Sequence, residues 1–415
     1  MAADPVVMFG YSAGLAARLD ASLEPGSVLV VEEPDVVHRR DLHRTVTAVC
    51  VGRIVECEYQ LAGPLDTVLD TLPPPRAVLT GVEYGVRAAA RAAERFGLPG
   101  QGAGAAELFT DKALLRAAAG RAGLRNPRHV VAQDPAAAAE FVRTAPLPCV
   151  VKPTARHASL GVRIVHGPDA AAQAWEQARA PEEPLLVPDR GITSQVLVEE
   201  LVVGREFSVE MLVRAGVPVF TNITAKHLLA GDHPVDMGHD VPAALSPPEQ
   251  AALTGAMTTL IRATGYGTGV LHGEWIVDAD RVPVLLECAA RMPGDSLCEL
   301  IDRAWGFDVA AAYLELLTGG MPAVPERPVG GAAIRFLAPA PGRVSAVHGT
   351  DRAREVPHVI EVEVDVVAGD RVPELHSSWD RCGHVVAAAP TPAAAAAATA
   401  AAVAAIGIVT EPGPG

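Results

Sequence analysis

Short apolar runs alternate with helical stretches through the first hundred residues, and this alternation restricts the fold more than any other feature. The predicted strands are VVMFG (6–10), SVLVVE (27–32), TAVCVG (47–52) and RAVLTG (76–81). The segment YGVRAAARAAERFG (84–97) predicts an amphipathic helix that ends at Gly97. Strands that alternate with helices usually form a parallel sheet with helices on both faces. We therefore expect a doubly wound N-terminal lobe.

The rest of the chain predicts further α+β structure. Four more strands are expected in PCVVKP (148–153), GVRIV (161–165), QVLVEE (195–200) and EFSVEMLV (206–213). With the helices between them, they indicate a small α+β lobe that has an antiparallel sheet. Glycines and prolines between Gly319 and Pro328 indicate a linker. The remaining residues hold several strands and an alanine-rich helix, enough for a small closing α+β domain.

Composition argues against several classes of protein. The formal net charge of −15 makes a nucleic-acid partner unexpected, because phosphate binding requires a basic surface. Six scattered cysteines without a Cys-x-x-Cys pair indicate reduced thiols and a cytoplasmic location. The N-terminus lacks the basic start and apolar core of a signal peptide. Segment 392–410 is the one candidate membrane span, but alanine gains little from lipid, so we expect a packed helix and no membrane partner.

The segment HGEWIVDADRVPVLLECAARMPGD (272–295) predicts a β-hairpin, because two apolar runs flank a polar DAD. A turn centred between Asp280 and Arg281 places Glu274 directly opposite Glu287. Facing side chains on paired strands have Cβ atoms about 4.5–5.5 Å apart, a distance at which like charges repel. A cation is therefore expected between the two carboxylates.

Among the 34 Lys and Arg residues there are only three lysines, Lys112, Lys152 and Lys226. Lys112 opens a predicted helix, Lys152 ends an apolar strand and Lys226 follows a strand. A lysine ammonium is a compact point charge, which suits triphosphate oxygens better than the planar fork of arginine. The alternative is that these are surface lysines left by chance in an arginine-rich chain.

Two loops between predicted strands have residues that suit a nucleotide. TARHASLGV (154–162) carries Ser159 and Gly161, and its backbone N–H groups and hydroxyl suit a phosphate. It is not a Walker A loop, which requires Gly-x-x-x-x-Gly-Lys-Ser/Thr before a helix. In VLVEELVVGREFSVE (196–210), backbone groups of a strand-to-turn hinge suit adenine and a carboxylate suits the ribose. A solvated acidic turn is the competing interpretation.

These pieces occur in one order: Asp-Lys on a helix, Val-Lys-Pro before a loop, Glu-Glu with Gly-x-Glu, and a glutamate hairpin that ends in Arg. In this order the sequence resembles the ATP-grasp superfamily, specifically its carboxylate–amine ligases of the L-amino-acid ligase type, over about residues 5–410. The resemblance implies an ATP-grasp fold with three domains. They are a Rossmann-like pre-ATP-grasp domain (1–105), an ATP-grasp domain (106–325) with a lid at about 127–205, and a C-terminal ligase subdomain (326–415).

The resemblance also implies roles for the nucleotide-binding residues. Lys112 and Lys152 match the lysines that hold the ATP phosphates, and Ser159 lies in the phosphate loop. Lys226 matches the lysine on the γ-phosphate side. Glu206 matches the ribose ligand. The adenine hinge aligns with Glu199, Glu200, Leu201 and Val202.

The glutamate hairpin carries the implied metal and substrate ligands. Glu274 and Glu287 match carboxylates that bind Mg²⁺, a hard cation that takes carboxylate and phosphate oxygens; Mn²⁺ is an alternative. Arg291 matches the arginine that binds the substrate carboxylate and its phosphorylated form, as a bidentate guanidinium can. Many relatives have Asn two residues after the second glutamate, where this chain has Ala289. The sequence therefore leaves open whether the site binds one metal ion or two.

The implied activity is ATP-dependent formation of an amide through an acyl phosphate, with a dipeptide-like product and release of ADP and phosphate. The implied partners are an amino-acid carboxylate and an amine, and a homodimer is one expected assembly. His239 and Glu83 are candidate substrate contacts, for which a structural histidine and a solvated carboxylate are the alternatives. The sequence does not identify the two substrates or the base that takes the proton of the amine.

Three other functions are weighed against this one. The first is an ATP-grasp ligase that uses a carrier-protein thiol or another nucleophile, and the second is a nucleotide-binding protein without catalysis. The third follows from GYSAG (10–14), which has the Gly-x-Ser-x-Gly pattern of α/β-hydrolases at Ser12. Too few residues precede Ser12 to build the central sheet of a hydrolase, so a strand-to-helix turn is the better interpretation.

Overall fold

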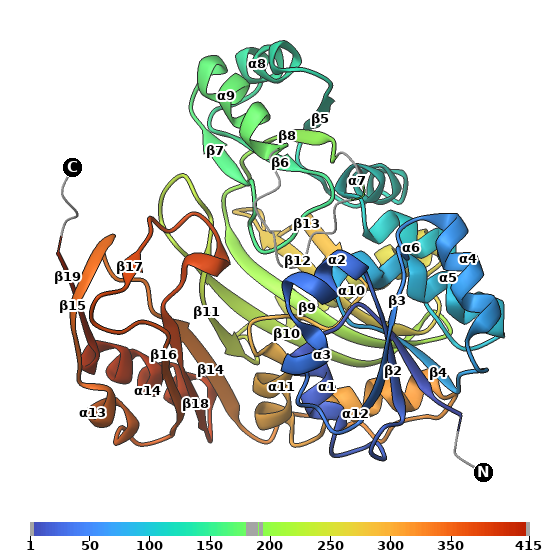
Figure 1. Ribbon diagram of the computed structural model, residues 1–415. Coiled ribbons are helices and arrows are strands. Elements are labelled where there is room, and N and C mark those ends of the chain that lie inside the picture. Colours follow the sequence, from blue (N-terminus) through green and yellow to red (C-terminus); the bar gives the residue numbers. More distant parts are fainter. Residues whose placement is uncertain (1–3, 180–189, 191–193, 412–415) are drawn as a thin grey trace.

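The computed structural model describes residues 4–179, 190 and 194–411, and the strands in these residues form four sheets (Figure 1). The first sheet builds the N-terminal lobe, and the second builds the lobe at the top of Figure 1. The third has eight strands and runs from the middle of the molecule into its C-terminal part. The fourth is a small sheet near the C-terminus.

The N-terminal lobe is a parallel sheet in the order β3-β2-β1-β4. Its strands are β1 (Val6–Phe9), β2 (Val28–Glu32), β3 (Val51–Glu56) and β4 (Ala77–Thr80). Its helices are α1 (Ala13–Leu19), α2 (Pro34–Arg39), α3 (Leu42–Thr45), α4 (Ala62–Thr71) and α5 (Val86–Phe96). Val6 and Met8 of β1 pack in one apolar cluster with α1, while Val7 and Phe9 pack in another with α5. Both faces of the sheet are thus covered, which confirms the expected α/β lobe.

The strand predicted at 47–52 is wrong, because β3 begins only at Val51. The residues before it form a turn in which the backbone N–H groups of Val49 and Cys50 donate to the Asp20 carboxylate (3.0 and 2.7 Å). Cys50 is buried from this turn, so its apolar character does not require a strand. β3 itself is an edge strand, where a polar residue such as Arg53 is tolerated.

The lid lobe has an antiparallel sheet in the order β5-β8-β6-β7. Its strands are β5 (His129–Ala132), β6 (Cys149–Pro153), β7 (Arg163–Val165) and β8 (Val196–Glu200). Two helices, α8 (Pro135–Thr144) and α9 (Pro168–Ala178), cover it, and Trp175 of α9 donates its indole N–H to the Ala132 carbonyl (2.9 Å). The antiparallel α+β lid is therefore confirmed, but the strand at 206–213 that was expected in this lobe is wrong: it is part of β9 (Arg205–Arg214), which pairs with β10 (Val217–Leu228) and β12 (Gly269–Val277) in the eight-stranded sheet. Residues 180–189 and 191–193 of the predicted lid lie outside the described residues.

The large sheet is antiparallel throughout, in the order β13-β12-β9-β10-β11-β14-β18-β16. Its first strands along the chain are β9 (Arg205–Arg214), β10 (Val217–Leu228), β11 (Asp236–Val241), β12 (Gly269–Val277) and β13 (Pro283–Ala289). The other three are β14 (Gly331–Phe336), β16 (Val359–Val364) and β18 (Gly383–Ala389). Three strands of the C-terminal part of the chain thus continue the sheet of the preceding part. The three domain boundaries remain predictions.

The remaining elements pack around these sheets. The helices are α6 (Ala103–Phe109), α7 (Lys112–Arg121), α10 (Pro247–Thr264), α11 (Leu297–Trp305), α12 (Val309–Leu317), α13 (Thr350–Arg354) and α14 (Pro392–Ala405). Two 3-10 turns are η1 (Glu83–Gly85) and η2 (Ser378–Asp380), and the small sheet has β17 (Arg371–Val372), β15 (Gly342–His348) and β19 (Gly407–Glu411). The alanine-rich α14 packs on β14 and β18, as expected. Within the described part of the chain, every helix is too short or too polar to cross a membrane.

The β12–β13 hairpin brings Glu274 and Glu287 opposite each other, as predicted. The turn is centred on Asp280, half a residue earlier than the symmetrical turn assumed, and a β-bulge at Leu286 restores the predicted register at the far end. The Leu286 carbonyl accepts a hydrogen bond from Arg116 (2.6 Å). Arg116 of α7 (Lys112–Arg121) therefore stabilises the bulge.

Deleting residues from 331 onward should make the rest of the chain insoluble. The deletion unpairs β11, whose open edge would aggregate, and removes Ile334 and Val386 from the apolar cluster that they share with Leu19 of the N-terminal lobe. Solubility after centrifugation and circular dichroism, compared with the full-length chain, measure the effect. A soluble fragment with a cooperative unfolding transition would contradict this prediction.

Candidate active site

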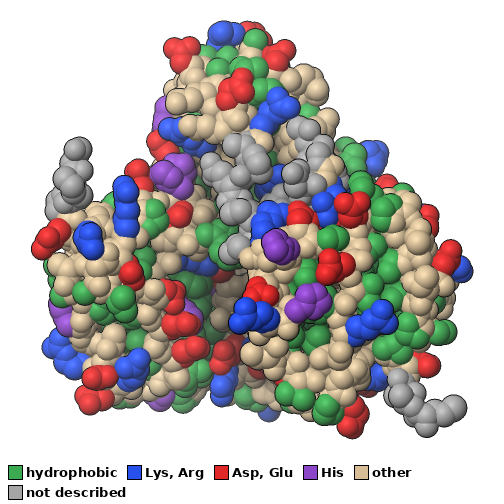
Figure 2. All heavy atoms as spheres, viewed as in Figure 1, with side chains coloured by type: hydrophobic (Ala, Val, Ile, Leu, Met, Phe, Trp, Pro, Cys, Tyr) green, Lys and Arg blue, Asp and Glu red, His purple; other side chains and the backbone are tan. Residues whose placement is uncertain are grey.

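A cavity of about 1230 Å³ lies where the lid, the N-terminal lobe and the eight-stranded sheet meet. Figure 2 shows that the surface is indented between the N-terminal lobe and the C-terminal part of the chain. The residues predicted for the site all line this cavity: Glu83, Lys112, Lys152, Ser159, Glu199, Glu200, Leu201, Val202, Glu206, Lys226, His239, Glu274, Glu287 and Arg291. The fold therefore brings together side chains from β6, β8, β9, β10, β11 and the β12–β13 hairpin.

The hinge at the end of β8 forms one part of the cavity wall. Glu199 is buried and forms ion pairs with Arg116 (2.6 Å) and Lys152 (2.6 Å). Burial alone would raise the pKa of Glu199, but the two cations outweigh burial and hold the pKa at about 2. Glu200 accepts a hydrogen bond from the backbone N–H of Arg128 (3.0 Å). The carboxylate of Glu199 therefore anchors the hinge to α7 and β6.

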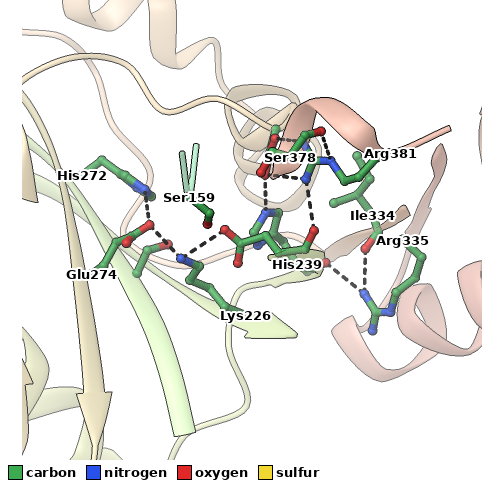
Figure 3. A network of polar contacts seen from close by, with 12 residues as sticks. Ser159, Lys226, His239, His272, Glu274, Ile334, Arg335, Ser378 and Arg381 are labelled. Atoms are coloured by element: carbon green, nitrogen blue, oxygen red, sulfur yellow. Dashed lines mark hydrogen bonds and ion pairs between the residues drawn. The ribbon is translucent and has the colours of Figure 1, made fainter. Parts of the chain in front are cut away.

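Lys226 is the centre of a cluster of carboxylates (Figure 3). It lies inside β10, whereas the sequence analysis placed it after a strand; the strand continues because its polar end still pairs with β11. Its Nζ lies 2.7 Å from Glu206 Oε1, 2.7 Å from Glu274 Oε1 and 3.3 Å from Asp236 Oδ2. Burial would lower the pKa of Lys226, but the three carboxylates raise it well above its usual value. Burial and the neighbouring carboxylates of Glu274 and Asp236 outweigh the ammonium of Lys226, and together they raise the pKa of Glu206 to about 7.

Glu274 and Glu287 present carboxylates from adjacent strands. Lys226 and Lys112 each contact one of them, since Lys112 Nζ lies 3.1 Å from Glu287 Oε1. Both contacts involve Oε1 of the glutamate. Two oxygen donors on facing strands are the donor type that Mg²⁺ or Mn²⁺ takes. The residues present fit a divalent hard cation.

The predicted phosphate loop (154–162), which follows β6, has an unusual backbone. Ala158 and Ser159 are consecutive non-glycine residues with positive φ (57° and 59°). The Ser159 hydroxyl donates to the Pro234 carbonyl (2.9 Å), and the Ala158 carbonyl accepts from the backbone N–H of Ser378 (3.4 Å). Lys112 donates to the Arg156 carbonyl (2.5 Å). The loop is thus tied to three separate parts of the chain, and the Ser159 hydroxyl proton is engaged with a backbone carbonyl.

Arg291 lies just beyond β13 and pairs with the N-terminal lobe. Its Nε donates to Glu83 Oε2 (2.7 Å), and its Nη1 donates to the Met292 carbonyl (3.0 Å). The Glu83 carboxylate is therefore a fixed partner of Arg291 and not a solvated loop residue. Together the two side chains place a positive and a negative group side by side on the cavity wall.

The charged residues of the cavity that the sequence analysis missed include Asp236, His272, Asp295 and Arg381. Asp295 accepts a bidentate pair from Arg381 (2.5 and 3.0 Å) and lies 3.2 Å from His239 Nε2 (Figure 3). Burial would raise the pKa of Asp295, but the hydrogen bonds from His239 and Arg381 hold it well below its usual value. The sequence signal that could have identified Asp295 as a cavity residue is its position four residues after Arg291. No local pattern marks Arg381.

Asp236, His239 and Asp295 also have ligand atoms within 4.8 Å of one another. Lys226 already pairs with Asp236, and Arg381 already pairs with Asp295. Because two cations occupy these carboxylates, we assign no metal ion to this group.

Comparisons with protein families match two parts of the chain. The ATP-grasp domain family matches residues 145–299, and the L-amino acid ligase C-terminal domain 2 family matches residues 335–411. The chain therefore combines an ATP-grasp domain with an L-amino acid ligase C-terminal domain, which supports the L-amino-acid ligase type of the ATP-grasp superfamily. Most of the cavity residues described above, including Lys152, the hinge and the facing glutamates, lie within the matched ATP-grasp segment.

Known relatives agree with this assignment. Alanine–anticapsin ligase from Bacillus subtilis (strain 168) is 26% identical over 261 residues, which cover 59% of this ATP-grasp chain and 54% of that protein. The match therefore spans little more than half the length of this relative. L-amino acid ligase from Bacillus licheniformis has the same fold, with a TM-score of 0.78 at 18% identity over 98% of this chain and 99% of that chain.

A structure solved with a nucleotide has the fold as well. It is the biotin carboxylase domain of 2-oxoglutarate carboxylase from Hydrogenobacter thermophilus, in complex with MgADP, ADP and bicarbonate. Its TM-score is 0.65 at 15% identity, over 97% of this chain and 90% of that chain.

Replacing Arg116 by Met should lower the free energy of unfolding by about 3–5 kcal/mol, because a buried carboxylate loses one of its two cations. The Leu286 carbonyl also loses the hydrogen bond that it accepts from Arg116. Urea unfolding of the purified variant measures the loss. Arg121→Met, an exposed change on the same helix, is the control and should stay within about 0.5 kcal/mol of wild type. A loss below about 1 kcal/mol for Arg116→Met would show that Lys152 alone balances Glu199.

Proposed function

We propose that this protein is an ATP-dependent carboxylate–amine ligase that joins an amino acid to an amine through an acyl phosphate and releases ADP and phosphate. One observation carries the proposal: a single cavity combines a nucleotide hinge, three lysines, two facing glutamates and an arginine. The L-amino acid ligase domain match and the name of the relative alanine–anticapsin ligase support a dipeptide-like product. A cytoplasmic location and a homodimer remain predictions.

The proposed nucleotide site uses the three lysines as phosphate ligands. Each of them pairs with a carboxylate: Lys112 with Glu287, Lys152 with Glu199, and Lys226 with Glu206 and Glu274. When Glu274 and Glu287 turn to a bound cation, Lys226 and Lys112 each lose a carboxylate contact and can bind phosphate oxygens instead. Glu206 is then the carboxylate proposed for the ribose hydroxyls, and backbone groups of 199–202 are proposed for adenine.

Glu274 and Glu287 are the proposed ligands of Mg²⁺ or Mn²⁺. A divalent cation bound there would neutralise phosphate charge as the phosphoryl group moves. Ala289 offers no ligand atom on this strand, so the two glutamates are the hairpin's own donors.

The proposed reaction begins with activation of the acid. A carboxylate does not react with an amine at neutral pH, because oxide is too poor a leaving group. Moving the γ-phosphoryl group of ATP onto the carboxylate makes phosphate the leaving group, and catalysis of that transfer is mostly positioning and charge neutralisation. The lysines supply positive charge at fixed positions, where preorganised charges stabilise the transition state most effectively.

Arg291 is the proposed ligand of the acyl group. Its Nε and one Nη1 hydrogen are engaged by Glu83 and Met292, so the rest of its guanidinium faces the cavity. There it would donate to the substrate carboxylate and later to the oxyanion that forms when the amine attacks the acyl carbon. The phosphate loop is hydrogen-bonded to Ser378, which helps to close the cavity and keep water from the acyl phosphate.

The first experiment is turnover of Mg-ATP with pairs of acids and amines drawn from an amino-acid panel. ADP, AMP and phosphate are measured, and products are identified by mass spectrometry. ADP and phosphate that form only with a particular pair, together with the condensation mass, support the ligase. AMP and pyrophosphate would contradict the acyl phosphate. Turnover only with a carrier-protein thiol would favour the alternative nucleophile, and EDTA should abolish turnover if a divalent cation is required.

Glu287→Ala should lower amide formation by at least about 100-fold, because it removes a proposed metal ligand and leaves the Lys112 ammonium without that carboxylate. The Mg²⁺ dependence of the residual rate should move to higher concentration. Glu299→Ala, on α11 and outside the cavity, is the control and should keep the wild-type rate. Normal turnover by Glu287→Ala would refute the metal assignment.

Arg291→Lys should keep nucleotide affinity but lower ligation about 100-fold, because an ammonium cannot reproduce the bidentate fork. Binding of Mg-ADP by calorimetry and steady-state ligation rates measure the two effects. Arg303→Lys on α11 serves as the matched change at an exposed site. A wild-type ligation rate in Arg291→Lys would remove this arginine from the site.

A further inference from the structure

The C-terminal part of the chain inserts one arginine into the cavity wall, and this arginine is unusually constrained. Arg381 follows η2 and its side chain is 11% exposed. It donates to both oxygens of Asp295, at 2.5 Å (Nη2) and 3.0 Å (Nη1). Nη1 also donates to the Asp236 carbonyl (3.1 Å), and Nε donates to the Ser378 carbonyl (2.9 Å). The guanidinium lies 3.6 Å from the centroid of the Phe336 ring.

These contacts join separate parts of the site. Asp236 begins β11 and contacts Lys226, Ser378 contacts the phosphate loop, and Asp295 lies on the loop that follows Arg291. A lysine could provide the charge of Arg381 but not its planar fork, which meets Asp295 bidentately and stacks on Phe336 at the same time. The geometry is therefore specific to arginine.

The partner of Arg381 has a strained backbone. Asp295 and Ser296 are consecutive non-glycine residues with φ of 53° and 57°. Each left-handed residue of this kind costs about 1–2 kcal/mol, and such conformations persist only where the surroundings impose them. Arg381 and His239 hold the Asp295 side chain, and α11 begins directly after Ser296. The strained pair thus connects Arg291 to the start of a helix over five residues.

We propose that Arg381 is a positioning residue, which acts through its ion pair with Asp295 to hold the 291–296 loop, and with it Arg291, in the conformation that binds the acyl group. The inference rests on the proposed role of Arg291. It gives the C-terminal domain a direct part in the reaction: this domain completes the substrate side of the cavity in addition to extending the sheet.

An ion pair with only a structural role would not explain why the strained backbone at Asp295 and Ser296 lies beside the substrate side of the cavity. Glycine adopts positive φ without steric cost, and the loop has a glycine at 294 but not at the two strained positions. Asp295 has a side chain 23% exposed that lines the cavity, next to the arginine proposed for the acyl group. Strain of this kind, beside a substrate-binding group, is typical of a site whose geometry is held under constraint.

The test compares Arg381→Gln with Arg381→Lys and Asp295→Asn. For all three we expect kcat/KM for the acid to fall about 10–100-fold, since small misplacements of a substrate-binding group have effects of this size. The Kd for Mg-ADP should change less than about threefold, because the Arg381–Asp295 ion pair makes no direct contact with the hinge or with any of the three lysines. Arg381→Gln combined with Asp295→Asn should be no worse than the more impaired single variant, since both changes remove one interaction.

Arg18→Gln is the matched control. Arg18 forms an ion pair with Asp302 (2.5 Å), which also joins a distant segment to α11 but lies outside the cavity. It should leave kcat/KM within about twofold of wild type. A loss in Arg18→Gln as large as that in Arg381→Gln would mean that general loosening of α11 explains both, and would overturn the proposal. So would a wild-type kcat/KM in Arg381→Gln.

A crystal structure of Arg381→Gln gives a readout that does not depend on activity. We expect at least one of residues 295 and 296 to leave the left-handed region and Arg291 to separate from Glu83. An unchanged loop would overturn the proposal. If Arg381→Gln does not fold, the nearly isosteric Asp295→Asn replaces it in both measurements. A wild-type protein that forms no amide with any acid–amine pair would refute the proposed function, whereas the crystal structure would still decide whether Arg381 holds the loop.

Discussion

The ammonium of Lys226 holds three carboxylates from three strands, and the geometry of the cavity depends on this cluster. Glu206, Asp236 and Glu274 come from β9, β11 and β12, which are contiguous with β10 in the large sheet. Three adjacent, partly buried carboxylates without a cation would be destabilising. A slip of one residue in β10 would turn Lys226 to the other face of the sheet and break all three contacts. The cluster therefore ties the register of the sheet to the proposed phosphate and metal sites.

A second cluster of charged residues, which is buried, fixes the position of the hinge at the end of β8. Arg116 and Lys152 flank Glu199, and Arg116 also binds the carbonyl at the bulge of the β12–β13 hairpin. One side chain of α7 thus sets both the hinge and the bulge that keeps Glu287 opposite Glu274. The two ends of the proposed nucleotide site are linked through a single helix, which explains why an arginine is completely buried there.

Much of the site could be predicted because its motifs are local. The opposition of Glu274 and Glu287 follows from a single hairpin, β12 (Gly269–Val277) with β13 (Pro283–Ala289), where pairing rules apply directly. The three lysines could be recognised because arginine is the ordinary cation of this chain. Arg381 and Asp295 are 86 residues apart and share no pattern, so only the folded chain brings them together. The strand predicted at 47–52 was wrong for a related reason: Ala48 and Cys50 are buried from a turn in which backbone N–H groups bind the distant Asp20, while Val49 is exposed.

The continuity of the eight-stranded sheet has a mechanical consequence. Lys226 and Glu274 lie on strands hydrogen-bonded into the same sheet as β14 and β18, so the C-terminal part cannot swing away from them without breaking backbone pairing. The lid has its own sheet, and side chains and loop hydrogen bonds join it to the cavity. Any displacement of the lid therefore takes place against a floor that carries the proposed acyl-binding wall with it.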